Sequence, residues 1–184
     1  MTDKKDALTS RIQEAKNYKK DANGKYVYTG DLYKLNMTKK EIDGVVKRMW
    51  IYAGIAFVLE LLGGVIPFAG MMESYYVVVP YCAELIMEML LFWACFHFST
   101  YRYAMAPSQY NKSVRRSLTV SVVYMLLGLI SIICSIVYVI INGFHNDVLF
   151  FIIYLLGKMA IIAVNFFINK YVASLDFRVS KNGE

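Results

Sequence analysis

Four ionisable side chains lie inside the long apolar runs of this sequence, where charges are rare. They are Glu60, Glu84, Glu88 and Lys158. At the centre of a bilayer a charged side chain costs about 2.5–3.5 kcal/mol on insertion scales, so such residues usually pair with one another or mark a path for ions or protons. Three carboxylates and one amine are therefore the best candidates for chemistry in this chain.

Three of these side chains are expected at one depth in the membrane. Glu60, Glu88 and Lys158 each lie about 10 or 11 residues from the basic end of their apolar run, which corresponds to roughly 15 Å and the bilayer midplane. Glu84 is one helical turn from Glu88 on the same face. We expect Lys158 to pair with Glu88 or Glu60, which leaves two carboxylates for a proton or a bound cation to balance.

Polar neighbours at helical spacing extend this predicted cluster. Tyr81 shares a face with Glu84, and Tyr154 and Asn165 share a face with Lys158. Three interpretations are open. The cluster could be a structural clasp of salt bridges and hydrogen bonds that fixes which helices are neighbours. It could bind a proton, an ion or a cationic solute, or it could pair with another subunit.

The elements that must position these residues are four apolar runs. The chain has 184 residues, of which 58% are hydrophobic, and its mean hydropathy is +0.43. Runs at 49–69, 77–99, 118–141 and 148–168 are each long enough to cross a bilayer as a helix. Short connections favour antiparallel neighbours. The predicted fold is an all-α membrane protein, an up-down bundle of four transmembrane helices formed by two helical hairpins.

The basic residues predict the orientation of these spans. All 19 Lys and Arg residues outside the apolar runs lie in 1–48, 100–116 or 169–184, whereas the connections 70–76 and 142–147 have none. Positive charge accumulates on the cytoplasmic side. We therefore expect both termini in the cytoplasm, with a polar basic segment at 1–48, a transmembrane domain at 49–169 and a tail at 170–184. The expected location is the cell (plasma or inner) membrane.

The polar N-terminal segment carries three local signals. Residues 1–24 have a thin apolar stripe, which predicts either a short surface helix or disorder. Residues 25–35 alternate aromatic and polar types around Thr29-Gly30-Asp31, which predicts a small hairpin that must dock on other structure. Thr38 and Glu41 form a capping-box pattern, which predicts a helix from about Lys39.

Stripes of small and polar residues predict which helix faces point inward. In the third span Ser121, Gly128 and Ser135 recur every seven residues. Small residues let helix backbones approach, and polar residues seek partners where water is absent. The seven-residue recurrence favours left-handed crossing of packed helices.

The net charge of +6 is distributed as a membrane-surface belt. Basic side chains beside the spans are expected to contact anionic lipid headgroups on the cytoplasmic face. These predicted contacts are Lys47, Arg48, Arg102, Lys112, Arg115 and Arg116. No nucleic-acid recognition module accompanies the charge, so we expect no nucleic-acid partner.

The sequence has none of the recognisable catalytic sets. It contains no GxSG, HExxH, P-loop, GxGxxG or CxxC motif, and only two histidines. The three cysteines, Cys82, Cys95 and Cys134, all lie in apolar runs and are expected to be small buried hydrophobic residues. The chain is therefore predicted not to be an enzyme and to bind no metal or cofactor.

Two functions remain open. The first is a non-catalytic accessory or scaffold subunit, present as a homo-oligomer or in a larger membrane complex. The second is a transporter for protons, ions or a cationic solute that uses the glutamates within the membrane. Four helices with such a glutamate, Glu60, in the first resemble small multidrug transporters in outline. The chain departs from that family in its long N-terminal segment, its fixed orientation and its additional Glu and Lys residues.

Overall fold

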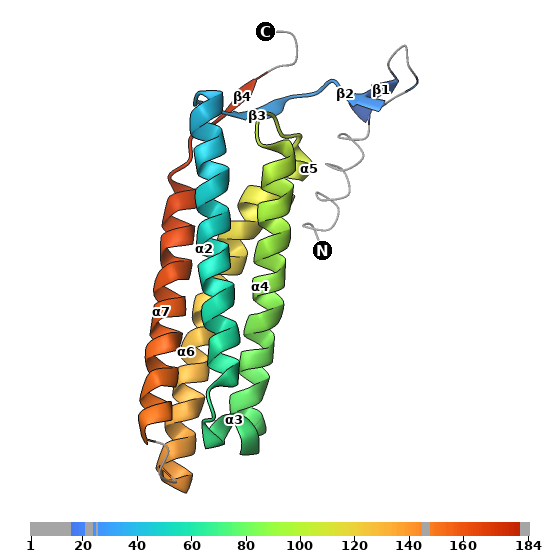
Figure 1. The fold of residues 1–184 in the computed structure, drawn as a ribbon. Helices are drawn as coiled ribbons and strands as arrows, with labels where there is room; N and C mark the ends of the chain where they lie inside the picture. The colour runs from blue at the N-terminus through green and yellow to red at the C-terminus, as the bar shows by residue number, and fades with distance from the viewer. Residues whose placement is uncertain (1–15, 21–23, 25, 145–147, 181–184) are drawn as a thin grey trace.

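Long antiparallel helices make up most of the chain (Figure 1). The computed structural model describes residues 16–20, 24, 26–144 and 148–180. Among them, the helices longer than 20 residues are α2 (Lys39–Val65), α4 (Tyr75–Tyr101), α6 (Arg116–Asn142) and α7 (Val148–Ala173). α2 packs against α4, α4 against α6, α6 against α7, and α7 back against α2, so each long helix lies between two others. The prediction of a mainly helical chain is confirmed.

Three of the described helices are long and apolar enough to cross a membrane. They cover Tyr75–Tyr101, Pro107–Asn142 and Val148–Ala173. α2 is not among them. Its first turns carry Lys39, Glu41 and Lys47, so its apolar part is shorter than that of the other three helices.

The helix in the first apolar run ends earlier than predicted. α2 stops at Val65, and Ile66 has an extended backbone with φ −63° and ψ 123°. Pro67 explains this break, because a proline disfavours the helical conformation of the residue before it. The short helix α3 (Ala69–Glu73) follows, so the predicted span 49–69 is wrong at its end.

The other long helices extend beyond the predicted apolar runs. α4 starts at Tyr75, two residues before the predicted run, and contains Pro80 in its second turn. α7 continues to Ala173, five residues past the predicted 148–168.

The start of α2 follows the predicted capping box. The Thr38 backbone N–H donates to Glu41 Oε2 over 2.8 Å, and the Glu41 backbone N–H donates to the Thr38 hydroxyl over 3.4 Å. These two bonds satisfy donors that the first helical turn leaves free. The helix begins at Lys39, as predicted.

The hairpin predicted for 25–35 is wrong, because its two halves pair with different strands. β1 (Tyr18–Lys20) pairs antiparallel with β2 (Tyr26–Tyr28), and β3 (Leu32–Leu35) pairs antiparallel with β4 (Phe177–Ser180). The connection between β1 and β2 contains Gly24 at φ 75°, a conformation that suits glycine. The surface helix or disorder predicted within 1–24 falls mainly outside the described residues.

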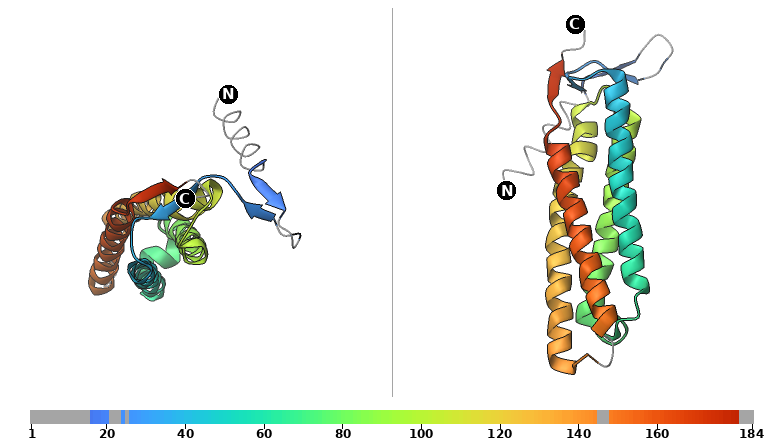
Figure 2. Two further views of the ribbon diagram at one scale, coloured as in Figure 1. Left: turned by 90° about the horizontal axis from the view of Figure 1, so that it is seen from above. Right: turned by 60° about the vertical axis from the view of Figure 1, so that its left-hand side comes forward.

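A small cap closes the end of the bundle where α2 starts. Figure 2 shows β3 and β4 lying across this end. Tyr33 of β3 exchanges backbone hydrogen bonds of 2.8 and 2.9 Å with Met105, in the connection after α4. The Tyr33 ring stacks on Tyr110 at 4.4 Å between centroids, and Tyr110 meets Phe177 of β4 edge-on at 5.1 Å. Tyr110 ends α5 (Pro107–Tyr110), which leads through the π-helix η1 (Asn111–Arg115) into α6. Segments from both ends of the chain are thereby held on the bundle.

Candidate functional site

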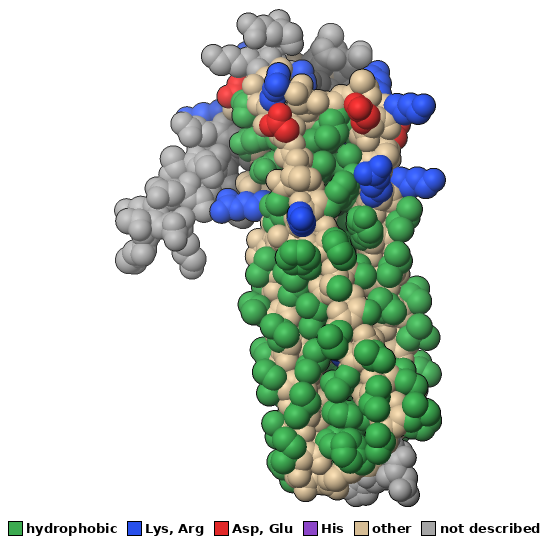
Figure 3. Space-filling view, turned by 90° about the vertical axis from the view of Figure 1, so that its left-hand side faces the viewer, with side chains coloured by type: hydrophobic (Ala, Val, Ile, Leu, Met, Phe, Trp, Pro, Cys, Tyr) green, Lys and Arg blue, Asp and Glu red, His purple; other side chains and the backbone are tan. Residues whose placement is uncertain are grey.

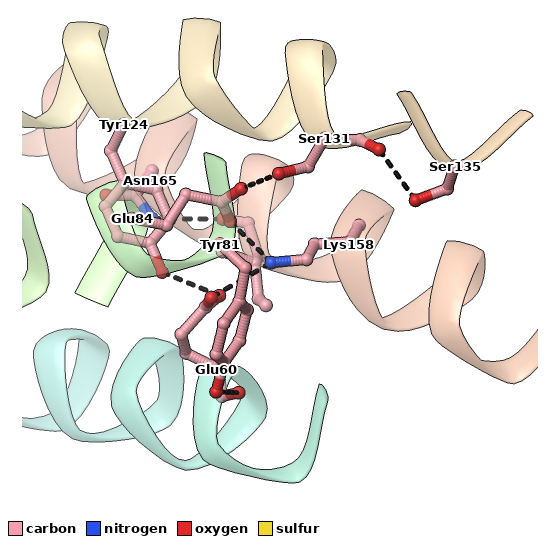
Figure 4. Close-up of polar contacts among 9 residues, drawn as sticks. Glu60, Tyr81, Glu84, Tyr124, Ser131, Ser135, Lys158 and Asn165 are labelled. Atoms are coloured by element: carbon pink, nitrogen blue, oxygen red, sulfur yellow. Dashed lines mark hydrogen bonds and ion pairs between the residues drawn. The ribbon is translucent and has the colours of Figure 1, made fainter. Parts of the chain in front are cut away.

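Lys158 of α7 lies at the centre of a buried charged cluster (Figure 4). Its ammonium nitrogen is 2.9 Å from Glu60 Oε1 on α2 and 2.6 Å from Glu84 Oε2 on α4. Lys158 is 1% exposed, and both carboxylates are 0% exposed. The amine therefore joins two helices to α7 through ion pairs that are closed off from the surface.

The carboxylate oxygens that do not face Lys158 accept hydrogen bonds from α6. The Tyr124 hydroxyl donates to Glu60 Oε2 over 2.9 Å. The Ser131 hydroxyl donates to Glu84 Oε1. Residues of α2, α4, α6 and α7 thus take part in one network, which we call the Lys158 network: Glu60, Glu84, Tyr124, Ser131 and Lys158. Hydrogen bonds to ionised groups are about twice as strong as neutral ones.

Two tyrosine rings flank the ammonium group of Lys158. Its nitrogen lies 4.9 Å from the centroid of the Tyr81 ring and 5.6 Å from that of Tyr154. Cations within about 6 Å of a ring face are attracted by the ring quadrupole. The Tyr81 hydroxyl donates to the backbone oxygen of Glu60 over 3.2 Å. A Cβ at Gly64 would collide with this hydroxyl, so the glycine permits the close approach of α4 to α2.

Glu88 does not belong to the network, and the predicted pairing of Lys158 with Glu88 is wrong. Glu88 is 0% exposed, and neither of its carboxylate oxygens has a hydrogen-bond partner among the described residues. It lies one helical turn, about 6 Å along the axis, from Glu84. Lys158 lies at the same level along the bundle as Glu84. Its ammonium group is paired with Glu60 and Glu84, and Glu88 lies one turn away. The predicted pairing with Glu60 is confirmed.

Asn165 is buried but lies apart from the ion pairs. It is two turns from Lys158 on α7, and its side-chain amide donates to the backbone oxygen of Ile161 over 3.2 Å. Its Oδ1 atom is buried and has no hydrogen-bond partner in the described part of the chain. Asn165 therefore shares the interior face that the spacing predicts without touching Lys158.

The described interior holds more carboxylates than amines. Glu60, Glu84 and Glu88 are all fully buried, and Lys158 is the buried amine among the described residues. A charge buried in a medium of low dielectric is unfavourable unless it is paired. A proton or a cation must therefore compensate the excess negative charge. No group of three or more His, Cys, Asp or Glu side chains in the described regions has the arrangement of a metal site.

Two members of the network were not among the predicted site residues. Tyr124 and Ser131 lie on the same face of α6 as Ser121, Gly128 and Ser135, and all five are buried. The stripe of small residues predicts that this face of α6 points inward, but the span contains no Glu or Lys that would mark Tyr124 as part of a charged site. Its helical spacing within the stripe is the feature of the sequence that indicates a buried position for Tyr124.

The predicted headgroup contacts all lie near one end of the bundle. Figure 3 shows Lys and Arg side chains gathered at the capped end, above a surface that is otherwise mainly hydrophobic. Lys47, Lys112 and Arg115 are exposed. Arg102 pairs with Asp43 at 2.9 Å, and Arg48 lies 5.9 Å from the ring centre of Tyr171, so these two also hold helix ends together.

The fold and site define a helical protein with three apolar helices compatible with a membrane and a charged cluster inside the bundle. No family model matches the chain, and no curated protein or solved structure shows a significant similarity to it.

Proposed function

We propose that the chain is a multi-pass membrane protein with four spans and both termini in the cytoplasm. The outer face of α2 supports the fourth span, because its large apolar residues Ile55, Val58 and Leu62 are exposed, as on the other three long helices. Such a surface is expected where side chains contact acyl chains. The 19 basic residues outside the apolar runs support the orientation.

Labelling of single cysteines in intact cells tests this topology. Cysteines at Met72 and at Ser174 would lie on opposite faces of the membrane in the proposed arrangement. A membrane-impermeant maleimide should label Met72→Cys from outside and Ser174→Cys only after lysis, in a background where Cys82, Cys95 and Cys134 are serine. Labelling of both positions from outside would contradict the four-span arrangement.

Within this topology we propose a non-catalytic accessory or scaffold subunit. The observation that carries the proposal is the Lys158 network, because it joins four helices and is closed to the surface. A network of this kind fixes helix neighbours and leaves little room for a substrate. The cap of β3, β4 and Tyr110 adds an ordered cytoplasmic surface on which a partner can assemble.

Crosslinking in native membranes tests the accessory role. The full chain, tagged at its C-terminus and expressed from its own promoter, should yield a discrete crosslinked complex that copurifies in mild detergent. A Tyr110→Ala variant removes the ring between Tyr33 and Phe177, so it should reduce the complex without removing the protein from the membrane. A strain with the untagged chain is the control. Recovery of monomer alone from both the tagged original chain and the Tyr110→Ala variant would contradict this role.

Glu88 favours transport as the second candidate. Its buried carboxylate lacks a described partner, and the Lys158 network already contains more acid than base. Groups that must gain and lose a proton or cation within the membrane are typical of coupled transporters. In this function Glu88, Glu84 and Glu60 bind the coupling ion or a cationic solute in turn.

Flux measurements in proteoliposomes test this second candidate. Glu88→Gln should abolish flux of protons or of a lipophilic cation without unfolding the bundle. Glu73→Gln is the matched control, because Glu73 is outside the cluster and bonds the Tyr138 hydroxyl at 2.8 Å. Unchanged flux in the Gln variants of all three buried glutamates would remove them from any transport mechanism.

A further inference from the structure

An open groove runs between α4 and α6 below the π-helix η1. It has a volume of about 500 Å³. It is lined by Met87, Leu90, Asn111, Arg115, Arg116, Thr119, Val120 and Val123. The charged cluster contributes none of these residues, so the groove is a separate feature of the fold.

The two ends of the groove differ in chemistry. Arg115, Arg116 and Asn111 form a polar rim, and neither arginine has an acidic partner within 4 Å among the described residues. The connection 102–116 contains no acidic residue at all. Below the rim, Met87 and Val123 belong to an apolar floor. An occupant must therefore combine an anionic head with an apolar body.

The floor of the groove is long enough to hold part of an acyl chain. From Arg116 to Val123 the floor follows α6 for about 10 Å, at 1.5 Å per residue. The hydrocarbon core is roughly 30 Å thick, so a groove that starts at the headgroups would reach well into one leaflet. This step rests on the proposed membrane placement of α4 and α6.

We propose that this groove binds one anionic phospholipid, with its phosphate on Arg115 and Arg116 and an acyl chain along Leu90 and Val123. Paired guanidinium groups are well suited to phosphate, because their planar N–H donors match its oxygens. The rim includes the end of η1, and π-helical turns are frequent at functional sites.

A second groove at the same end of the bundle has a different charge. It lies between α2 and α7, has a volume of about 460 Å³, and is lined in part by Lys40, Glu41, Arg48 and Tyr171. Glu41 offsets one of its two positive charges, and the Arg48 guanidinium lies against the Tyr171 ring at 5.9 Å. The charge of this second groove is mixed, and it serves as an internal control.

Lipid titration of the purified full chain tests the proposal. In mild detergent, native mass spectrometry should show one dioleoyl phosphatidylglycerol retained in preference to dioleoyl phosphatidylcholine. Each basic residue contributes roughly fivefold to attraction for an anionic lipid, so the double variant Arg115→Gln with Arg116→Gln should bind about 25-fold more weakly. The matched double variant Lys39→Gln with Lys40→Gln, which removes two exposed positive charges at the same end of the bundle, should stay within about twofold. Equal loss in both would show attraction by surface charge alone and overturn the proposal.

A change in the floor separates a lipid from a free phosphate or another occupant. Leu90→Trp should fill the groove and release phosphatidylglycerol, whereas glycerol 1-phosphate at millimolar concentration should not compete in any variant. Competition by glycerol 1-phosphate would indicate a phosphate site and overturn the lipid assignment. A photocrosslinker at Val123 should capture lipid, and capture of a second copy of the chain would overturn it too. Because binding is measured in detergent, failure here is distinguishable from failure of the accessory role or topology.

Discussion

Glu84 and Glu88 lie one turn apart on the same face of α4, yet their surroundings are opposite. Both are 0% exposed. Glu84 accepts from Lys158 at 2.6 Å and from the Ser131 hydroxyl. Glu88 has no hydrogen-bond partner in the described regions for either carboxylate oxygen. The same residue type on one helix face is therefore part of a network at one level and isolated at the next.

This difference shows that burial and pairing are determined separately. Helical periodicity decides which side chains of α4 face the interior, because residues three and four apart share a face. The axial register of α7 decides which of them meets Lys158. One turn is 5.4 Å, which is well beyond hydrogen-bond length, so a shift of one turn exchanges the paired and the unpaired glutamate.

Removal of the shared amine should have the largest effect on this comparison. Lys158→Met leaves Glu60 and Glu84 buried without a counter-charge, and breaking a buried ion pair in this way costs about 3–5 kcal/mol. We expect a large fall in the midpoint of thermal unfolding in mild detergent, or failure to accumulate in the membrane. Tryptophan fluorescence from Trp50 and Trp93 reports the transition.

A triple variant keeps this test interpretable if the single variant does not fold. Lys158→Met combined with Glu60→Gln and Glu84→Gln removes all three charges together, so most of the lost stability should return. If Lys158→Met alone unfolds at the same temperature as the original chain, the ion pairs contribute nothing to the bundle and the clasp interpretation is wrong.

The second prediction compares the two glutamates directly. Glu84→Gln removes ionic hydrogen bonds to Lys158 and should lower the free energy of unfolding by roughly 1.5–3 kcal/mol. Glu88→Gln removes no described hydrogen bond and should change it by less than about 1 kcal/mol. The two variants have the same change of side chain on the same helix face, so each controls for the other. Equal losses would mean that Glu88 has a partner as strong as that of Glu84.

The sequence predicted most of the helical interior. Glu60, Glu84, Glu88, Lys158 and Tyr154 were assigned to it from helical spacing, and all five are buried. Helical periodicity is a property of the local sequence, so the inward face of a helix can be predicted without knowing which helices pack against it. The Thr38–Glu41 capping box gave the start of α2 for the same reason.

The sequence could not predict features that depend on contacts between distant segments. The ends of the apolar runs predict the depth of each residue in the membrane only to about one helical turn, since α7 continues five residues past its predicted end. An error of this size is enough to place Glu88, instead of Glu84, beside Glu60 as an expected partner of Lys158. The pairing of β3 with β4 joins residues more than 140 positions apart, and no local pattern specifies such a partner.

The third prediction concerns the α6 side of the network. Tyr124→Phe removes the hydroxyl that donates to Glu60 Oε2 over 2.9 Å. The expected loss is about 1–1.5 kcal/mol, below that of Glu84→Gln, because Glu60 keeps its bond to Lys158. Tyr138→Phe, on the same face of α6 but bonded to Glu73, is the matched control for loss of a tyrosine hydroxyl. In a Glu60→Gln background the effect of Tyr124→Phe should shrink, and a double-mutant cycle measures that coupling.

The smallest effect is expected at Glu41, a glutamate whose partners come from its own helix start. The Thr38 backbone N–H and, less strongly, the Thr38 hydroxyl hold the pKa of Glu41 below its ordinary value of 4.5. A carboxyl with a lowered pKa in the folded state stabilises the fold above the pKa of the unfolded chain, and this contribution disappears as the pH falls through the folded pKa. Glu41→Gln should therefore lower the unfolding midpoint slightly at pH 7, and the difference from the original chain should close as the pH falls through the lowered pKa of Glu41.

The effects of Glu41→Gln and Glu84→Gln on the unfolding midpoint should respond differently to added detergent, because the first residue is paired locally and the second across helices. The Glu41 bonds form whenever the first turn of α2 forms, because donor and acceptor are three residues apart. The Glu84 bonds form only when α4, α6 and α7 have docked in register. Added detergent that loosens helix packing should therefore erase the Glu84→Gln effect and leave the Glu41→Gln effect in place. Loss of both together would show that the start of α2 is itself held by the packed bundle.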